Sequence, residues 1–353
     1  MSAGAPVHAL RWARRLCGWA AVAACALAGV AAQASPTLEA VRARGAVQCG
    51  VSPGMLGFSM PGVGSGGWEG LDVDICRAVA AAVLGSGDKV QFVHLQVDER
   101  LSALREGRFD ILAFAASYTM SRDADMGLQG TVVTYYDGQG FLVPAASKIR
   151  STRQLRGLPI CVTTTGSSEQ TLQEYSTANK MEFKVQRFAR FKEATDAYLA
   201  KRCAAIAADA TSLAAIRRSQ IPNPADHLIL PELISKEPLG PMVRRGDEAW
   251  ALIVSWVIHG LIAAEEHGVT RANVNQQAAS STDAEVRRML GHGADTGKLI
   301  GLDREWLLRA LRTTGNYGEI FNRNVGPDSP LGLPRGLNAL WRHGGLQYAL
   351  PLR

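Results

Sequence analysis

The chain lacks the patterns that metal and redox sites need. Its 353 residues hold only six cysteines and seven histidines, with no Cys-x-x-Cys or His-Glu-x-x-His spacing. Zinc binding and thioredoxin-type chemistry therefore have no candidate residues. Gly62 to Gly67 spell G-x-G-x-x-G, but this loop does not join a strand directly to a helix, so no dinucleotide cofactor is expected either.

The chain also lacks a strong excess of one charge. Lys and Arg number 38 against 32 Asp and Glu, a formal charge of +6. Arg11, Arg14 and Arg15 lie in the first 34 residues, which contain no acid, so the remainder carries only +3, spread along the chain. This excess is too small to predict a nucleic-acid partner.

Long apolar runs are few, and the first one lies at the N-terminus. Arginines precede the uncharged run 16–31, and Ala32-Gln33-Ala34 then supplies a small-x-small site. Residues 1–34 are predicted to be a secretory signal peptide, cleaved after Ala34. Two alternatives remain: a membrane anchor, and a lipoprotein attached through Cys25, which ends a lipobox-like Val22–Cys25. The later run 250–264 is interrupted by polar residues and is predicted to be a buried helix.

Export agrees with the cysteines that remain. Removal of the signal would leave Cys49, Cys76, Cys161 and Cys203, an even number in an oxidising compartment. Four cysteines allow three pairings. Proximity along the chain favours Cys49 with Cys76 and Cys161 with Cys203.

The mature chain alternates strand-like and helix-like segments. Strands are expected at 46–51, 90–95 and 109–114, and again at 159–163, 182–187 and 204–208, with helices between them. This alternation predicts βαβ units and mostly parallel sheets. A helix, turn and apolar strand at 103–113 recurs at 197–207, which predicts two similar α/β halves. Ligands of such sheets bind beyond the carboxyl ends of the strands, here at 115–122 and 209–211.

Several segments resemble one known family. The resemblance is carried by 37–45, 70–83, 134–141 and 234–241, and near the C-terminus by 315–321, 324–327, 335–341 and 344–348. Through them the chain resembles the periplasmic solute-binding proteins for polar amino acids, in particular the general L-amino-acid-binding subunits of ABC transporters. The resemblance implies an α/β clamshell of two lobes, each a mostly parallel sheet flanked by helices. Lobe 1 would comprise 36–139 and 240–353, the latter with a C-terminal extension, and lobe 2 would comprise 140–239.

The same resemblance implies a set of ligand-binding residues. Thr119-Met-Ser-Arg122 matches the motif whose arginine holds the ligand carboxylate, and Asp209 matches the aspartate that holds the ammonium. Ser117 and the loop Gly166, Ser167 and Ser168 match further ligand contacts, and Phe58 and Phe114 are also expected among the ligand-binding residues. Asp72 and Asp74 are expected to cap the helix that follows them.

Around these groups the sequence departs from the family pattern. Phe114, Ala115, Ala116, Ala208 and Ala210 stand where close relatives carry polar or charged residues, and Thr165 stands where the loop glycine is expected. An apolar wall cannot satisfy a buried charge, so the sequence predicts aliphatic or aromatic ligands over charged ones.

The predicted function is capture of a free amino acid in the interlobe cleft and its delivery to inner-membrane ABC permease subunits. A monomer in the periplasm is expected, with no catalytic residues, metal or cofactor. Alternatives are a dehydratase-like periplasmic enzyme on the same fold and a degenerate binding protein with a sensory role. An enzyme would need an acid or base in the cleft beyond the groups that hold the ligand, and the sequence supplies none.

Overall fold

The computed structural model describes residues 35–62, 67–164 and 166–353. The predicted signal segment with Cys25, most of the glycine loop at 62–67 and Thr165 lie outside the described residues.

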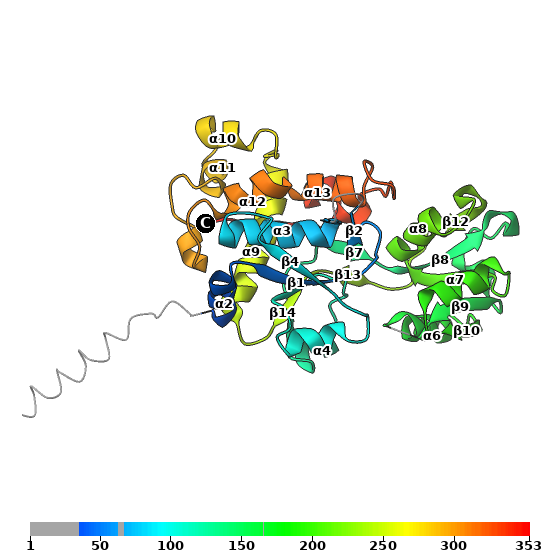
Figure 1. Cartoon of the computed structure of the whole chain (residues 1–353). Helices are drawn as coiled ribbons and strands as arrows, with labels where there is room; N and C mark the ends of the chain where they lie inside the picture. The colour runs from blue at the N-terminus through cyan, green and yellow to red at the C-terminus, as the bar shows by residue number, and fades with distance from the viewer. Residues whose placement is uncertain (1–34, 63–66, 165) are drawn as a thin grey trace, which may run out of the picture. The chain divides into compact units, whose positions relative to one another are not determined.

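Two five-stranded sheets organise the chain (Figure 1). The first has the order β4-β1-β5-β14-β6 and the second the order β10-β9-β11-β8-β12. The strands of the first are β1 (Val47–Val51), β4 (Val90–His94), β5 (Ile111–Leu112), β6 (Leu128–Gly130) and β14 (Met242–Arg244). Those of the second are β8 (Gln139–Pro144), β9 (Pro159–Thr163), β10 (Lys184–Phe188), β11 (Ala205–Asp209) and β12 (His227–Ile229).

The two sheets share one pattern of strand directions. In each, the first three strands are parallel, and the fourth runs antiparallel to both of its neighbours. The mostly parallel sheets predicted from the sequence are therefore confirmed, and so is the internal repeat. The strand expected at 109–114 is shorter than predicted, since β5 has only two residues.

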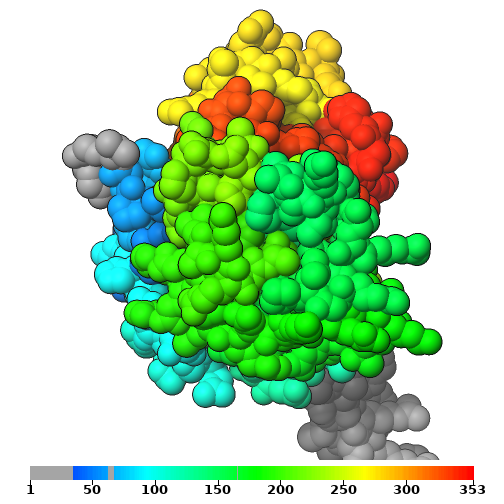
Figure 2. Space-filling model, turned by 90° about the vertical axis from the view of Figure 1, so that its right-hand side faces the viewer, coloured from blue at the N-terminus to red at the C-terminus, as the bar shows by residue number. Residues whose placement is uncertain are grey.

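Helices cover both sheets. Some helices pack directly on the first sheet, and others pack on those helices. Together they are α2 (Pro36–Arg44), α3 (Leu71–Leu84), α4 (Arg100–Arg105), α5 (Met120–Ala124), α9 (Glu248–Glu266), α10 (Val274–Ser280), α11 (Ala284–Met289), α12 (Trp306–Thr314) and α13 (Tyr317–Asn324). The second sheet carries α6 (Ser168–Ala178), α7 (Phe191–Leu199) and α8 (Ala210–Ser219). In Figure 2 the residues of this second sheet and its helices, coloured green, form the face toward the viewer.

Helix α3 forms the centre of the first core. Eleven of its fourteen residues are buried, and it ends where Gly85 adopts φ 85° and donates its N–H to Ala81. Such a left-handed C-cap favours glycine. Within the described part of the chain, α9 is the one helix with the length and apolar character of a membrane span. Of its apolar 18-residue stretch, 61% is buried. It packs with α3, α12 and α13, as the prediction of a buried helix requires.

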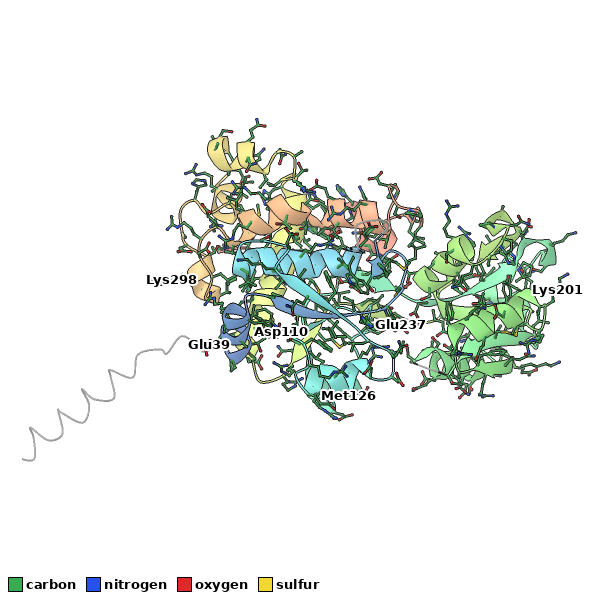
Figure 3. The ribbon with its side chains drawn as sticks, viewed as in Figure 1. Glu39, Asp110, Met126, Lys201, Glu237 and Lys298 are labelled. Atoms are coloured by element: carbon green, nitrogen blue, oxygen red, sulfur yellow. A yellow bond between two sulfur atoms is a disulfide. The ribbon has the colours of Figure 1, made fainter. Side chains whose placement is uncertain are left out.

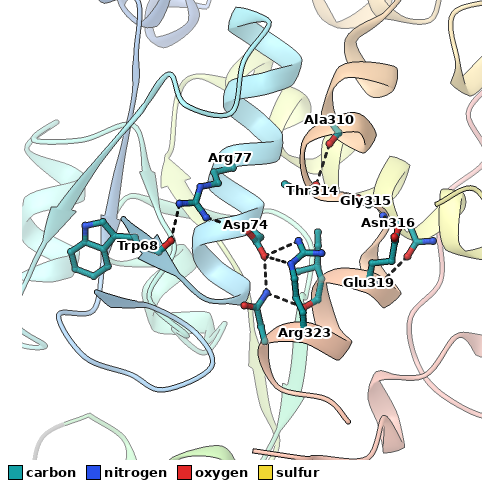
Figure 4. Close-up of polar contacts among 11 residues, drawn as sticks. Trp68, Asp74, Arg77, Ala310, Thr314, Gly315, Asn316, Glu319 and Arg323 are labelled. Atoms are coloured by element: carbon teal, nitrogen blue, oxygen red, sulfur yellow. Dashed lines mark hydrogen bonds and ion pairs between the residues drawn. The ribbon is translucent and has the colours of Figure 1, made fainter. Parts of the chain in front are cut away.

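Asp74 ties two of these helices together (Figure 4). Its carboxylate accepts hydrogen bonds from Arg323 Nε at 2.9 Å and Asn324 Nδ2 at 2.7 Å, both on α13. Asp72 accepts instead from the N–H of Ala115 at 2.8 Å. The expectation that these two aspartates cap α3 is wrong, because the N-cap is Gly70 and has no side-chain cap bond.

Two disulfides connect sheet strands to their surroundings. Cys49 on β1 bonds to Cys76 on α3, and Cys161 on β9 bonds to Cys203, just before β11. This is the pairing that proximity along the chain favoured.

A two-stranded ribbon carries the chain between the sheets. It consists of β7 (Tyr135–Asp137) and β13 (Glu237–Leu239), paired antiparallel with Glu237 opposite Asp137. We call it the connecting ribbon. A separate short hairpin, β2 (Met60–Pro61) and β3 (Trp68–Glu69), precedes α3.

Candidate functional site

A cavity of about 390 Å³ lies at the carboxyl ends of strands from both sheets. Residues that follow β5 line one side, and residues that follow β9 and β11 line the other. This is the edge at which parallel sheets bind ligands, and the volume is typical of small-molecule sites. The lining includes Arg100, Phe114, Ala115, Ser117, Arg122, Gly166, Ser167, Ser168, Ala208 and Asp209. The structure thus brings together seven of the eight predicted ligand-binding residues.

Arg122 enters the cavity from the short helix α5. Thr119 is the N-cap of this helix, and its hydroxyl accepts the N–H of Arg122 at 3.3 Å. The half-buried guanidinium donates one hydrogen bond to the carbonyl of Ser117, at 2.5 Å. Burial lowers the pKa of Arg122, and the negative charges of Glu237 and Asp209 oppose that shift. A guanidinium has five N–H donors, so most remain for a carboxylate in the cavity.

Asp209 lies on the opposite wall, at the end of β11. It is the N-cap residue of α8, but its side chain makes no cap bond. Burial raises its pKa to about 7; the nearby Asp137 and Glu237 add to the shift, and Arg100 and Arg122 partly offset it. A carboxylate in this environment gains from a cation, because a positive charge beside it favours the ionised form.

The remaining predicted groups surround these two charges. The Ser117 hydroxyl donates to Glu237, which leaves its oxygen as an acceptor on the cavity side. Ser167 is the N-cap of α6 and also has no side-chain cap bond. The first N–H groups of a helix have no partner within it, so this loop can present donors to an anion.

Phe58 is the predicted residue that the structure does not bring to the cavity. Its side chain is only 1% exposed and packs edge-on against Tyr135, with ring centroids 5.4 Å apart. Met55 and Met60, on either side of it in sequence, line the cavity instead. The turn that bonds the N–H of Phe58 to the Met55 carbonyl directs the ring into the core below.

Sequence reasoning missed Arg100. It is the first residue of α4, its side chain lines the cavity, and the residue is 8% exposed. Its guanidinium lies 4.8 Å from the centroid of the Phe114 ring, and its buried Nε has no hydrogen-bond partner among the described residues. Burial, with a smaller contribution from Arg122, lowers its pKa to about 10, while Asp209 opposes the shift.

A local signal for Arg100 did exist. An arginine in the first turn of a helix is unfavourable, because the helix dipole is positive there. Such a residue needs a compensating reason, and its position in the cavity supplies one. The cavity is also less apolar than the alanines predicted, since Arg100 joins Arg122 and Asp209 in its lining and Ala116 and Ala210 lie outside it.

The site shows no metal-binding cluster. Among residues 35–62, 67–164 and 166–353, no group of three or more His, Cys, Asp or Glu side chains is arranged to hold a metal ion.

Comparison with known proteins gives consistent matches. Residues 47–272 match the model of the bacterial extracellular solute-binding proteins, family 3. The chain is 46% identical to the glutamate/glutamine/aspartate/asparagine-binding protein BztA of Rhodobacter capsulatus, over 94% of this chain and 97% of that protein. It is 44% identical to the general L-amino acid-binding periplasmic protein AapJ of Rhizobium johnstonii, over 95% and 98%. A solved ABC transporter periplasmic binding protein from Brucella ovis, with glutathione bound, is 45% identical with a TM-score of 0.86, covering 91% of this chain and all of that one.

Proposed function

The chain belongs to family 3 of the bacterial extracellular solute-binding proteins, and from that premise we propose that its cavity captures a free amino acid for an ABC permease. The two-lobed α/β fold of periplasmic binding proteins is the one this chain adopts. Capture of a small ligand outside the cytoplasm and its delivery to a transporter is the activity of this family. We propose in addition which ligand is bound, which residues hold it and which subunits receive it.

Arg122 and Asp209 hold the two charges that every α-amino acid carries. The guanidinium receives the α-carboxylate, and Asp209 receives the ammonium from the facing wall. Each buried charge then has a partner, without which burial is very costly. Ser117 accepts from the ammonium, and the N–H groups at the start of α6 donate to the carboxylate. The observation that carries this assignment is the placement of Arg122 and Asp209 on facing walls of one cavity.

Arg100 selects the side chain of the ligand. A buried guanidinium without a carboxylate partner is satisfied by a ligand that brings a second anionic or carbonyl oxygen. The unpartnered Nε of Arg100 supports glutamate and aspartate, and then their amides, as ligands. This replaces the earlier expectation of aliphatic or aromatic ligands, because that expectation counted the alanines of the walls without Arg100.

The proposal includes the domain boundaries. Residues 36–139 and 240–353 form lobe 1 and residues 140–239 form lobe 2, so that each disulfide closes within one lobe. The position of the connecting ribbon between the two sheets supports this division. The cavity then lies between the lobes, and closure around the ligand excludes water from its charges.

The proposal also covers location and partners. Residues 1–34 direct export and are removed, the mature protein is a monomer in the periplasm, and the partners are inner-membrane ABC permease subunits. The protein is not an enzyme. Arg100, Arg122 and Asp209 are all used to hold the ligand, and the described residues that line the cavity include no further acid or base for chemistry.

A calorimetric titration panel tests the proposal. Glutamate, aspartate, glutamine, asparagine, leucine, phenylalanine, lysine and arginine are titrated into the mature protein. We expect glutamate to bind at least tenfold more tightly than leucine or lysine, a ratio that needs only ~1.4 kcal/mol. Arg100→Leu should remove that preference without abolishing binding, because Arg122 and Asp209 still hold the head group. Equal affinity for leucine and glutamate would contradict the role of Arg100, and mass spectrometry showing conversion of the ligand would contradict a pure binding role.

A further inference from the structure

Two buried carboxylates face each other in the connecting ribbon. Asp137 on β7 and Glu237 on β13 are directly opposite residues of the antiparallel pair, and they are 8% and 6% exposed. Figure 3 labels Glu237 where the ribbon passes between the two sheets. Like charges directly opposite each other destabilise a strand pair, so this arrangement needs a compensating role.

Glu237 contacts the ligand-binding segment that follows β5. It accepts a hydrogen bond from the Ser117 hydroxyl on one oxygen and, on the other, from the Ser235 hydroxyl at 3.0 Å. The backbone reinforces the contact, since Tyr118 donates its N–H to the Pro238 carbonyl at 2.9 Å. The segment that leads into Arg122 is therefore fastened to β13.

Asp137 contacts the ligand-binding segment of the other sheet. One of its oxygens accepts from both the hydroxyl and the N–H of Thr211, two residues after Asp209. Its other oxygen accepts the N–H of Gly138 at 2.8 Å, and the Gly138 carbonyl accepts the N–H of Ala210 at 2.9 Å. The segment that contains Asp209 is therefore fastened to β7.

Ionisation of both carboxylates is unfavourable, because they are buried and face each other. Burial raises the pKa of Asp137 to about 6, hydrogen bonds from Thr211 and Gly138 oppose that shift, and Glu237 adds to it. Asp209 and the guanidinium of Arg122 are the charged groups on the cavity side of the pair.

We propose that Asp137 and Glu237 form a coupling pair that holds Ser117 and Asp209 in register across the cavity. Each carboxylate positions one ligand-holding segment, and the strand pairing fixes the two carboxylates to each other. Neither residue lines the cavity, so both are positioning residues. This inference rests on the proposed function in that the cavity is taken to bind an amino acid.

The test compares changes at the pair with a change at Asn338, which binds the ribbon from outside it. Glu237→Gln and Asp137→Asn keep the size of the side chain, remove its charge and replace one accepting oxygen with a donating NH2 group. Asn338→Ala is the control, because Asn338 accepts the N–H of Tyr136 at 2.7 Å and donates to its carbonyl at 3.1 Å without touching either ligand-holding segment. All variants are titrated with L-glutamate, and their unfolding temperatures are measured.

We expect the two charge-removing variants to lose about tenfold in affinity for glutamate, the size of one charged hydrogen bond. Asn338→Ala should lower the unfolding temperature and leave affinity within about twofold, because it removes only hydrogen bonds to the ribbon backbone. In the double variant Glu237→Gln with Ser117→Ala, the combined loss should be smaller than the sum of the two single losses, because part of each acts through the Ser117–Glu237 hydrogen bond. Additive losses, or an equal loss of affinity in Asn338→Ala, would overturn the coupling pair.

A second measurement uses the ligand-free protein. Hydrogen exchange of segment 115–120 should accelerate in Glu237→Gln, that of segment 209–213 in Asp137→Asn, and neither in Asn338→Ala. Unchanged exchange in both segments refutes the inference. If the wild-type protein binds no amino acid, the proposed function fails, and the exchange measurement alone still decides whether the pair holds the two segments.

Discussion

At the scale of single residues, Arg122 and Asp209 differ in the hydrogen bonds that their side chains already make within the protein. Arg122 uses one donor on the Ser117 carbonyl, while Asp209 leaves the start of α8 uncapped. Both therefore retain capacity for a ligand. Asp209 occupies the N-cap position of α8 without making a cap bond, which leaves its carboxylate available to the ammonium that we propose it holds.

Arg122→Ala should abolish amino-acid binding. The change leaves the ligand carboxylate buried without its partner, which costs ~3–5 kcal/mol, or more than a hundredfold in affinity. Arg122→Lys should recover only part, since an ammonium cannot grip a carboxylate bidentately. Calorimetry with glutamate measures both. Arg108→Ala is the control, because Arg108 forms an exposed ion pair with Glu99; near wild-type affinity in Arg122→Ala would contradict the assignment.

Ligand affinity should fall as the pH falls below about 7. The pKa of Asp209 is raised to about 7 by burial, and an ammonium beside it lowers that value in the bound state. Binding therefore releases a proton at pH values below about 7 and none well above it. Affinity for glutamate should weaken from pH 8 to pH 5.5. The same titrations of Asp209→Asn should show weak binding that does not change with pH over this range. A constant dissociation constant across that range argues against the ammonium role.

At the scale of elements, the first turn of α3 holds the backbone of the cavity wall. Asp72 is buried and accepts the N–H of Ala115, a residue at φ 45°. Left-handed backbone is unfavourable for alanine and persists only where the surroundings impose it. The helix thus positions the segment that leads to Ser117.

The stability of the protein should depend on the charge of Asp72. Burial raises its pKa to about 7, opposed by the Ala115 hydrogen bond, while the unfolded chain has the usual value near 3.8. Between these pH values the folded state therefore binds more protons than the unfolded state. The stability that the protonated Asp72 carboxyl contributes is lost as the pH rises from about 4 to about 7. Asp72→Asn keeps a hydrogen-bond acceptor and lacks this slope, so it should gain stability relative to wild type between pH 5 and pH 8. Urea unfolding at both pH values checks this, and parallel changes in the two proteins would be the contrary result.

The two disulfides should stabilise their own sheets without shaping the site. Cys49–Cys76 spans 27 residues and Cys161–Cys203 spans 42, and none of the four lines the cavity. Replacing either pair with serines should cost ~2–4 kcal/mol by relaxing the unfolded chain. Thermal unfolding gives the cost, and a glutamate titration of the folded variants should give near wild-type affinity. A changed order of ligand preference would show that the disulfides do shape the site.

At the scale of the whole molecule, the site depends on both sheets. The connecting ribbon joins them, and the cavity draws its lining from both. A ligand that bridges Arg122 and Asp209 therefore favours a closed arrangement of the lobes, because it binds that arrangement more tightly.

Glutamate should compact the protein in solution. Small-angle X-ray scattering of the mature wild-type protein should show a smaller radius of gyration with saturating glutamate than without it. Arg122→Ala should show no such change at the same concentration, which separates ligand binding from any effect of the added salt. Identical scattering of wild type with and without bound glutamate would contradict closure of the lobes.

The sequence by itself determined the features that local pattern encodes. Alternation of apolar strands and amphipathic helices specified two mostly parallel α/β sheets. The ends of their strands located the segments 115–122 and 209–211, because parallel strands bring their carboxyl ends to one edge. Within those segments, the family resemblance singled out Arg122, Ser117 and Asp209. The cysteine pairing followed from proximity along the chain. Each of these depends on neighbours in sequence or on a rule of topology.

Only the tertiary structure decided the contacts between distant segments. Asp72 reaches Ala115 across 43 residues, and Ser117 reaches Glu237 across 120, so neither pair leaves a periodic trace in the chain. Phe58 turned into the core and Arg100 into the cavity, although sequence reasoning singled out the first and missed the second. The side that a side chain faces depends on what packs around it. The character of the cavity wall is therefore a property of the assembled fold, which brings Arg100 to the lining with Ala115 and Ala208 and leaves Ala116 and Ala210 outside it.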